Sequence, residues 1–104
     1  MTDDLVEIRL TPRAEADPED IWHHSAAAWS PEQVDRYIDG LVAVFDLLPS
    51  MPRIARARPE FTPPVRIHPT GPHLVIYCIA APHLEVLRVV GGRQDRQQLL
   101  EALE

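Results

Sequence analysis

The sequence has no lysine and only one cysteine, Cys78, among its 104 residues. A single cysteine excludes an internal disulfide and a zinc site built from cysteines alone, and it fits a reducing compartment, for which we expect the cytoplasm. The histidines lack partners at ligand spacing, so we expect neither a metal nor a cofactor. Without lysine, the long cationic side chains are all guanidiniums, which suit bidentate contacts with carboxylates and phosphates.

Long hydrophobic runs are missing as well. The longest apolar stretch, residues 74–81, is far shorter than the ~18 residues of a membrane-spanning helix. No basic start with a following hydrophobic run marks a signal peptide. At 45% hydrophobic and 25% charged residues, the composition is typical of one globular domain. We therefore expect a single domain over residues 1–104 that does not associate with membranes.

Negative charge is in excess but unevenly distributed. The net charge is −6, and residues 1–50 hold eleven acidic residues against three arginines, whereas residues 51–104 hold five against seven. Proteins that bind nucleic acids in bulk usually show a basic surface, so we expect no direct binding of nucleic acid. The second half could still form a local arginine-lined face.

The first third of the chain contains the signals of a strand and then of a helix. Residues 6–10 alternate apolar and charged side chains, which predicts a strand with one buried face. Thr11-Pro12 and Asp17-Pro18 each place a capping side chain before proline, as at a helix start. Two interpretations follow: one helix kinked at Pro18, or a turn at 12–16 followed by a helix from Pro18 to about Ala28. We favour a first turn that is roughly collinear with the main helix.

A second helix is predicted after Ser30. Ser30-Pro31-Glu32-Gln33 has a hydroxyl N-cap, proline at the first helical position and glutamine at the third, the pattern of a capping box. Apolar side chains then recur with helical period up to Pro49, which ends the helix. These are Val34, Tyr37, Ile38, Leu41, Phe45 and Leu48. The tight connection around Ser30 predicts an antiparallel helical hairpin.

The second half of the chain is predicted to be mostly strands. Five prolines between Pro49 and Pro64 predict a segment without regular structure. Strands are then expected at 65–68, 73–80 and 84–90, separated by turns that contain proline or glycine. Asp95 can cap a short final helix to about Leu103.

The predicted fold class is α+β. An N-terminal strand joins an antiparallel β-meander as an extra strand, the helical hairpin packs on this antiparallel sheet, and a short helix follows at the C-terminus. Val34, Phe45 and Ile76 are expected to meet in one interior.

This element order, with the residues it carries, resembles the ParE branch of the RelE/ParE toxin superfamily over about residues 5–96. The matching residues of the helical part are Leu10, Ala14, Asp17, Ile21, Trp22, Trp29, Gln33, Tyr37, Leu41 and Pro52. Those of the meander are Gly71, His73, Val75, Tyr77, Glu85, Arg88-Val89-Val90, Arg93 and Asp95. The chain departs from the family pattern at Pro18, at Pro72 and at Gly91, which stands where the family has histidine.

The resemblance implies the toxin of a type II toxin–antitoxin pair, of the kind associated with plasmid stabilisation. ParE-like toxins block DNA gyrase and stabilise its cleaved DNA intermediate without chemistry of their own, so an enzyme is not expected. Their antitoxin is usually ParD-like, with a DNA-binding N-terminal domain and a C-terminal segment that folds along the toxin. The implied state is therefore a hetero-oligomer with this antitoxin.

Two alternatives remain open. RelE-type relatives cut messenger RNA on the ribosome, which requires a general base, a general acid and a cation for the phosphorane charge. Arg66 or Arg88 could supply the cation and Glu85 or His73 the base, but no histidine or tyrosine follows Gly91 to supply the acid. The other alternative is a non-toxic ParE-like interaction module that keeps a partner surface and has lost its target.

The candidate residues for binding the target or the antitoxin are Trp22, Trp29, Arg53, Arg56, Arg66, His73, Tyr77, Arg88 and Arg93. The two tryptophans, seven residues apart, are either core residues or, if exposed, anchors for a partner. The arginines between 53 and 66 could bind an acidic antitoxin tail.

Arg88 has two interpretations. By strand period it shares a face with Val86 and Val90. It either ties the sheet edge to Glu85 or to the C-terminal tail, or it lies on the surface that meets gyrase or the antitoxin.

Overall fold

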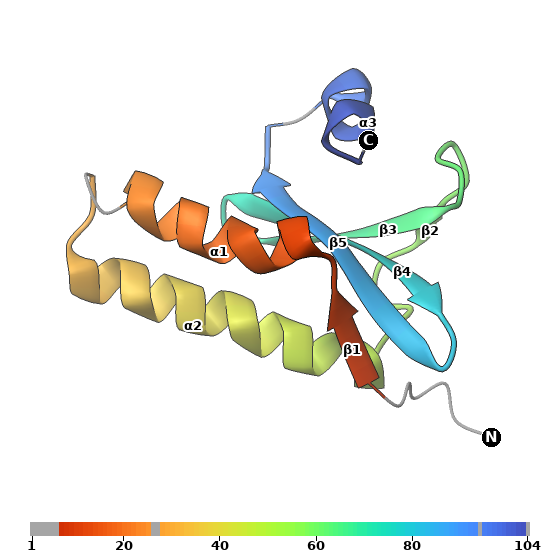
Figure 1. The fold of residues 1–104 in the computed structure, drawn as a ribbon, viewed down its shortest axis with the longest axis horizontal. Helices are drawn as coiled ribbons and strands as arrows, with labels where there is room; N and C mark the ends of the chain where they lie inside the picture. Colours follow the sequence, from red (N-terminus) through yellow and green to blue (C-terminus); the bar gives the residue numbers. More distant parts are fainter. Residues whose placement is uncertain (1–6, 26–27, 94, 104) are drawn as a thin grey trace.

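A computed structural model describes residues 7–25, 28–93 and 95–103. Figure 1 shows a layer of two long helices against a twisted sheet, with a short C-terminal helix beyond the end of the last strand. The elements in chain order are β1 (Glu7–Leu10), α1 (Pro12–Ser25), α2 (Pro31–Leu47), the 3-10 turn η1 (Leu48–Ser50), β2 (Ala57–Arg58), β3 (Val65–Thr70), β4 (His73–Ala80), β5 (His83–Gly91) and α3 (Arg96–Leu103).

The described residues form one five-stranded sheet with the order β1-β5-β4-β3-β2. The antiparallel meander β3-β4-β5 is confirmed, and β1 joins it beside β5 as predicted. However, β1 runs parallel to β5, so the sheet is mixed where an antiparallel sheet was expected. Parallel neighbours need a long crossover connection, and here the helical hairpin and the other strands supply it. Residue 6 of the predicted first strand lies outside the described residues.

The first helix runs without interruption through Pro18. It starts after Thr11, whose hydroxyl accepts a hydrogen bond from the Ala14 amide at 3.1 Å. The predicted turn at 12–16 is therefore the first turn of α1, which is described up to Ser25. The predicted end of this helix near Ala28 depends on residues 26–27, which lie outside the described ranges. Ala14 and Asp17 are its buried residues, one turn apart on the face toward the sheet.

The predicted helix caps at Ser30 and Asp95 are confirmed, whereas Asp17 lies inside α1 and caps no helix start. The Ser30 hydroxyl accepts from the Gln33 amide and the Gln33 side chain accepts from the Ser30 amide, each at 3.2 Å. At the start of α3, the Asp95 carboxylate accepts from the Gln98 amide at 2.8 Å. These contacts satisfy backbone N–H groups that have no partner within a helix.

The segment from Pro49 to Pro64 is more regular than predicted. The 3-10 turn extends α2, and Ala57 and Arg58 form the short edge strand β2 opposite Arg66 and Val65. Both residues have a backbone N–H group, which proline lacks, so they can pair with β3 although Pro52 and Pro59 flank them.

The described residues form two buried clusters, one on each side of the sheet. Val75 and Tyr77 point toward the helical hairpin, where Leu41 and Phe45 are buried with them. Ile76 points to the opposite side, where it packs with Phe61, Val65 and Leu99. Val34, Phe45 and Ile76 are all buried as expected. Because successive side chains of a strand alternate between its faces, Ile76 lies on the other side of the sheet from Phe45, so the expectation that the three meet in one interior is wrong.

A β-bulge changes the face of several residues in β5. Ile76 pairs with Arg88, whereas Tyr77 pairs with Val86, which leaves Leu87 as an extra residue. Val86 therefore lies in the cluster under the hairpin and Val90 against the opposite cluster. The prediction that Arg88 shares one face with both valines is wrong for this reason.

Within residues 7–25, 28–93 and 95–103, no helix combines the length and the apolar character needed to cross a bilayer.

Candidate functional site

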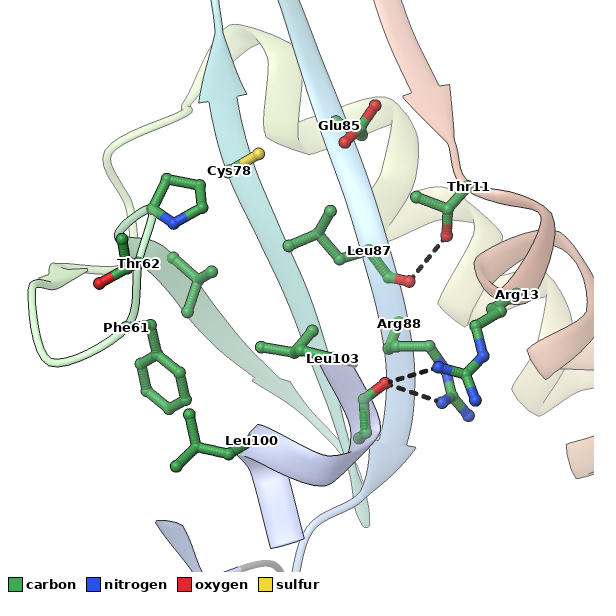
Figure 2. Close-up of a pocket in the computed structure, with 13 residues that line it drawn as sticks. Thr11, Arg13, Phe61, Thr62, Cys78, Glu85, Leu87, Arg88, Leu100 and Leu103 are labelled. Carbon is green, nitrogen blue, oxygen red and sulfur yellow. Dashed lines mark hydrogen bonds between the residues drawn. The ribbon is translucent and has the colours of Figure 1, made fainter. Parts of the chain in front are cut away.

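A groove of ≈ 460 Å³ lies on the side of the sheet that carries α3. Figure 2 shows its two halves: Phe61, Leu100 and Leu103 gather on one side, and the polar side chains of Thr11 and Arg13 lie on the other. The groove thus combines apolar side chains with charged ones of both signs, namely Arg13, Arg88 and Glu85.

Arg88 lies at the rim of this groove and is paired inside the molecule. Its Nε and Nη2 atoms donate to the two carboxylate oxygens of Asp17 at 2.8 and 3.0 Å, and its Nη1 atom donates to the Ala102 carbonyl at 3.1 Å. Asp17 is 6% exposed and also accepts from the Val89 amide at 2.8 Å. The hydrogen bonds with Asp17 are the main cause that raises the pKa of the Arg88 guanidinium.

This geometry supports the structural interpretation of Arg88. Arg88 connects β5 to α3 through the Ala102 carbonyl, which confirms the predicted contact with the C-terminal tail. Its carboxylate partner is Asp17 of α1 and not Glu85, which was the predicted partner. Asp17 is a residue that the site prediction missed. The sequence feature that indicates Asp17 is its position between Ala14 and Ile21 on the apolar side of α1. A carboxylate on that side is buried and therefore requires a charged or hydrogen-bonding partner.

A second cluster lies where α2 approaches the turn between β3 and β4. The Tyr37 hydroxyl is 2.6 Å from Nδ1 of His73 and donates to the Thr70 carbonyl at 3.1 Å. Burial lowers the pKa of His73 and raises the pKa of Tyr37. The Trp29 ring stands edge-on to Tyr37, with ring centres 5.8 Å apart.

The tryptophans do not fill the core as one interpretation predicted. Trp29 is 40% exposed, and Trp22 is half-buried with its indole N–H donating to Asp35 at 2.8 Å. The Trp22 contact joins α1 to α2. Because Trp29 is exposed, it can still act as an anchor for a partner, which is the other predicted role of the tryptophans.

The arginine loop after α2 holds the remaining candidates. Arg53 and Arg56 are exposed there, whereas Arg66 in β3 donates to the Ala55 carbonyl at 2.6 Å. Tyr77 is fully buried and donates to the Pro52 carbonyl at 2.9 Å, and burial raises its pKa. Tyr77 therefore cannot contact a partner directly, and its place in the predicted surface set is wrong.

The nine predicted site residues thus occupy separate places instead of one site. Trp22, Trp29 and His73 lie around the hairpin, and Arg88 lies at the groove. Arg53 and Arg56 are in the segment after α2, whereas Arg66 is in β3 and Tyr77 in β4. Arg93 is exposed shortly before α3. Across the described ranges, no three histidine, cysteine or acidic side chains are grouped to hold a metal ion.

Comparison with models of known protein families gives a match over most of the chain. The model of the family described as "ParE toxin of type II toxin-antitoxin system, parDE" matches residues 8–96, nearly the whole length. The chain belongs to the ParE toxin family. The resemblance found in the sequence is therefore confirmed.

Individual relatives agree with this family. Toxin ParE1 of Mycobacterium tuberculosis is 32% identical over 87 residues, which are 83% of this chain and 89% of that protein. Toxin ParE1 of Caulobacter vibrioides is 30% identical over 82 residues, 79% of this chain and 84% of the relative. A solved structure described as "Chromosomal ParDE TA system from P. aeruginosa" has the same fold, with a TM-score of 0.73 at 20% identity, covering 84% of this chain and 96% of that one.

Proposed function

We propose that this ParE toxin inhibits DNA gyrase by binding to it in the cytoplasm, and that a ParD-like antitoxin neutralises it in a hetero-oligomer. Family membership supports a toxin of this kind. The observation that favours binding over catalysis is the pairing of Arg88 with Asp17. A guanidinium held by a buried carboxylate is already neutralised, so it is a poor stabiliser of the charge that develops in phosphodiester cleavage.

The other candidate cation of a nuclease is held by a neutral backbone group. Arg66 donates to the Ala55 carbonyl. His73 interacts with Tyr37, away from Glu85, which lines the groove. The proposed contacts with gyrase or the antitoxin are therefore the exposed candidates Trp29, Arg53, Arg56 and Arg93, together with the partly exposed Trp22 and His73.

Two assays on the purified chain test this function. We expect inhibition of gyrase supercoiling with accumulation of cleaved plasmid, and intact messenger RNA when the chain is added to translating ribosomes. A plasmid incubated with the chain but without gyrase is the control. Cleaved RNA together with unaffected gyrase would establish the RelE-like nuclease instead, and the absence of both effects would establish a non-toxic interaction module.

A further inference from the structure

The first strand of the sheet has a neighbour on one side only. Among the described strands, β1 lies at the edge of the sheet and pairs with β5 alone. The Thr11 amide, directly after β1, donates to the Val86 carbonyl at 3.0 Å. Because the backbone groups of alternate residues point to opposite edges of a strand, the N–H and C=O groups of Ile8 and Leu10 point away from β5. This outer edge can therefore pair with another strand.

The side chains of β1 differ between the two faces of the strand. Ile8 and Leu10 are half-buried and pack against the cluster under the hairpin. Glu7 and Arg9 lie on the opposite face with side chains that are 49% and 58% exposed, and the Arg9 Nε atom donates to a Glu7 carboxylate oxygen at 2.8 Å. Charges of one sign at an edge keep other chains away, whereas charges of opposite sign can pair with a strand that carries the complementary order.

A two-fold axis restricts how two copies of β1 can pair with each other. In an antiparallel pair with this symmetry, one residue lies opposite its own copy. With Ile8 at the axis, Glu7 of each copy lies opposite Arg9 of the other. An axis at Glu7 or at Arg9 would instead place two like charges directly opposite each other, which is destabilising. Of these three registers, the one centred on Ile8 is complementary in charge.

We propose that two copies of this chain associate through β1, which joins their sheets edge to edge in antiparallel orientation about a two-fold axis at Ile8. The two Ile8 residues exchange their outward N–H···O=C hydrogen bonds, and their β-branched side chains lie side by side. Each Glu7 carboxylate pairs with the Arg9 guanidinium of the second copy. This association requires neither gyrase nor an antitoxin.

The charges of β5 extend the same alternation across the sheet. Arg9 lies opposite Glu85 in the parallel pair, and Glu7 lies opposite His83, whose Nδ1 atom is 3.5 Å from the Glu7 carboxylate. In the dimer, Arg9 therefore has Glu85 on one side and Glu7 of the second copy on the other. A strand without glutamate and arginine two residues apart would leave one of these charges unpaired, so a second copy fits this edge better than an arbitrary strand.

The contact is small, because only four residues of each copy form it. Stable protein interfaces bury ~1,200 Å² or more, so we expect a weak dimer in equilibrium with the monomer. The net charge of −6 on each copy opposes association. Salt screens charges that are more than ~8 Å apart at physiological ionic strength, and the charges that meet at the edge are closer than that.

Sedimentation equilibrium at physiological salt, with up to ~1 mM of the full chain, tests the association. We expect a reversible dimer. Glu7→Arg and Arg9→Glu each give the edge charges of one sign, so each variant alone should have a dimer dissociation constant at least tenfold higher. An equimolar mixture of the two variants should form a heterodimer within threefold of the affinity of the unaltered chain, because every facing pair is again of opposite sign. Both variants lose the contact between Glu7 and Arg9 within the chain, so that loss cannot produce the recovery.

The matched controls reverse charges at the other edge of the sheet. Arg58 of β2 pairs with Glu60 at 3.7 Å, and Arg58→Glu and Glu60→Arg should each leave the dissociation constant within twofold. Far-UV circular dichroism checks that every variant is folded. A chain that stays monomeric at ~1 mM would leave the edge to a strand of another protein and overturn the proposal. A mixture that associates no more tightly than either variant alone, or a dimer that is lost in the control variants instead, would also overturn it. Because the measurement contains no gyrase, failure of dimerisation and failure of gyrase inhibition are separate results.

Discussion

At the scale of single residues, the contact between Tyr37 and His73 shows how a polar pair can close an edge of the hairpin. The 2.6 Å contact joins α2 to the first residue of β4, and the Tyr37 ring lies against Gly71, where an added Cβ would approach it to 3.0 Å. Gly71 also has a φ of +55°, which glycine adopts without strain. Both features favour glycine at this turn.

The burial of His73 predicts a dependence of stability on pH. Burial lowers the pKa of His73 in the folded chain below its ordinary value of 6.5. As the pH falls through 6.5, the unfolded chain therefore binds a proton at His73 more readily than the folded chain does. The stabilisation that neutral His73 gives the folded chain is fully present above pH 6.5 and is lost as the pH falls through the pKa of the folded state. We therefore expect the unfolding free energy to decrease as the pH falls below about 7.

The comparison uses His73→Asn, which keeps a polar group near Nδ1 and does not titrate. Asp20, His24 and Arg88 line the same cavity as His73 and are unchanged in the variant, so the difference between the two urea-unfolding curves isolates His73. Parallel stability profiles of the variant and the unaltered chain across this range would show that His73 does not cause the decrease.

At the scale of elements, the Asp17–Arg88 pair joins α1, β5 and α3. Replacing Arg88 by methionine would leave the Asp17 carboxylate buried without its counter-ion, which costs about 3–5 kcal/mol. The double variant Asp17→Leu/Arg88→Met removes both charges and should regain most of that stability. Urea unfolding of the two single variants and the double variant gives the coupling free energy, and strictly additive losses would contradict a pairing role.

Local signals were sufficient for the helix starts. The caps at Ser30 and Asp95 depend on residues within one turn, so the sequence contains the whole interaction. The course of α1 through Pro18 was not decided locally, because packing of Ala14 and Asp17 against the sheet compensates for the hydrogen bond that proline cannot make. The strand β2 likewise needs β3 as its partner.

The candidate site was less predictable than the helices. The sequence predicts Arg66 and Tyr77 as binding residues, but both donate to carbonyls of the segment after α2. A contact between a side chain and a distant backbone group leaves no spacing signal in the sequence. The bulge at Leu87 had the same effect on Arg88, because one extra residue shifts every following side chain to the other face.

At the scale of the whole molecule, β4 couples two buried clusters. Val75 and Tyr77 belong to the cluster under the hairpin, and Ile76 between them belongs to the cluster under α3. The two tryptophans lie on the hairpin side, in contact with Asp35 and Tyr37. Tryptophan fluorescence therefore reports the hairpin, whereas far-UV circular dichroism reports the helices and the sheet together.

Shared strand residues predict that both clusters unfold in one transition. Ile76→Ala creates a cavity on the side away from the tryptophans and should cost about 2–5 kcal/mol, as should Leu41→Ala on the hairpin side. In each variant, the urea midpoints from fluorescence and from circular dichroism should fall together. If Ile76→Ala lowered only the midpoint from circular dichroism, the α3 side would unfold separately from the hairpin. Because β4 supplies adjacent buried residues to both clusters, neither side can lose its packing without loosening the strand that the other one uses.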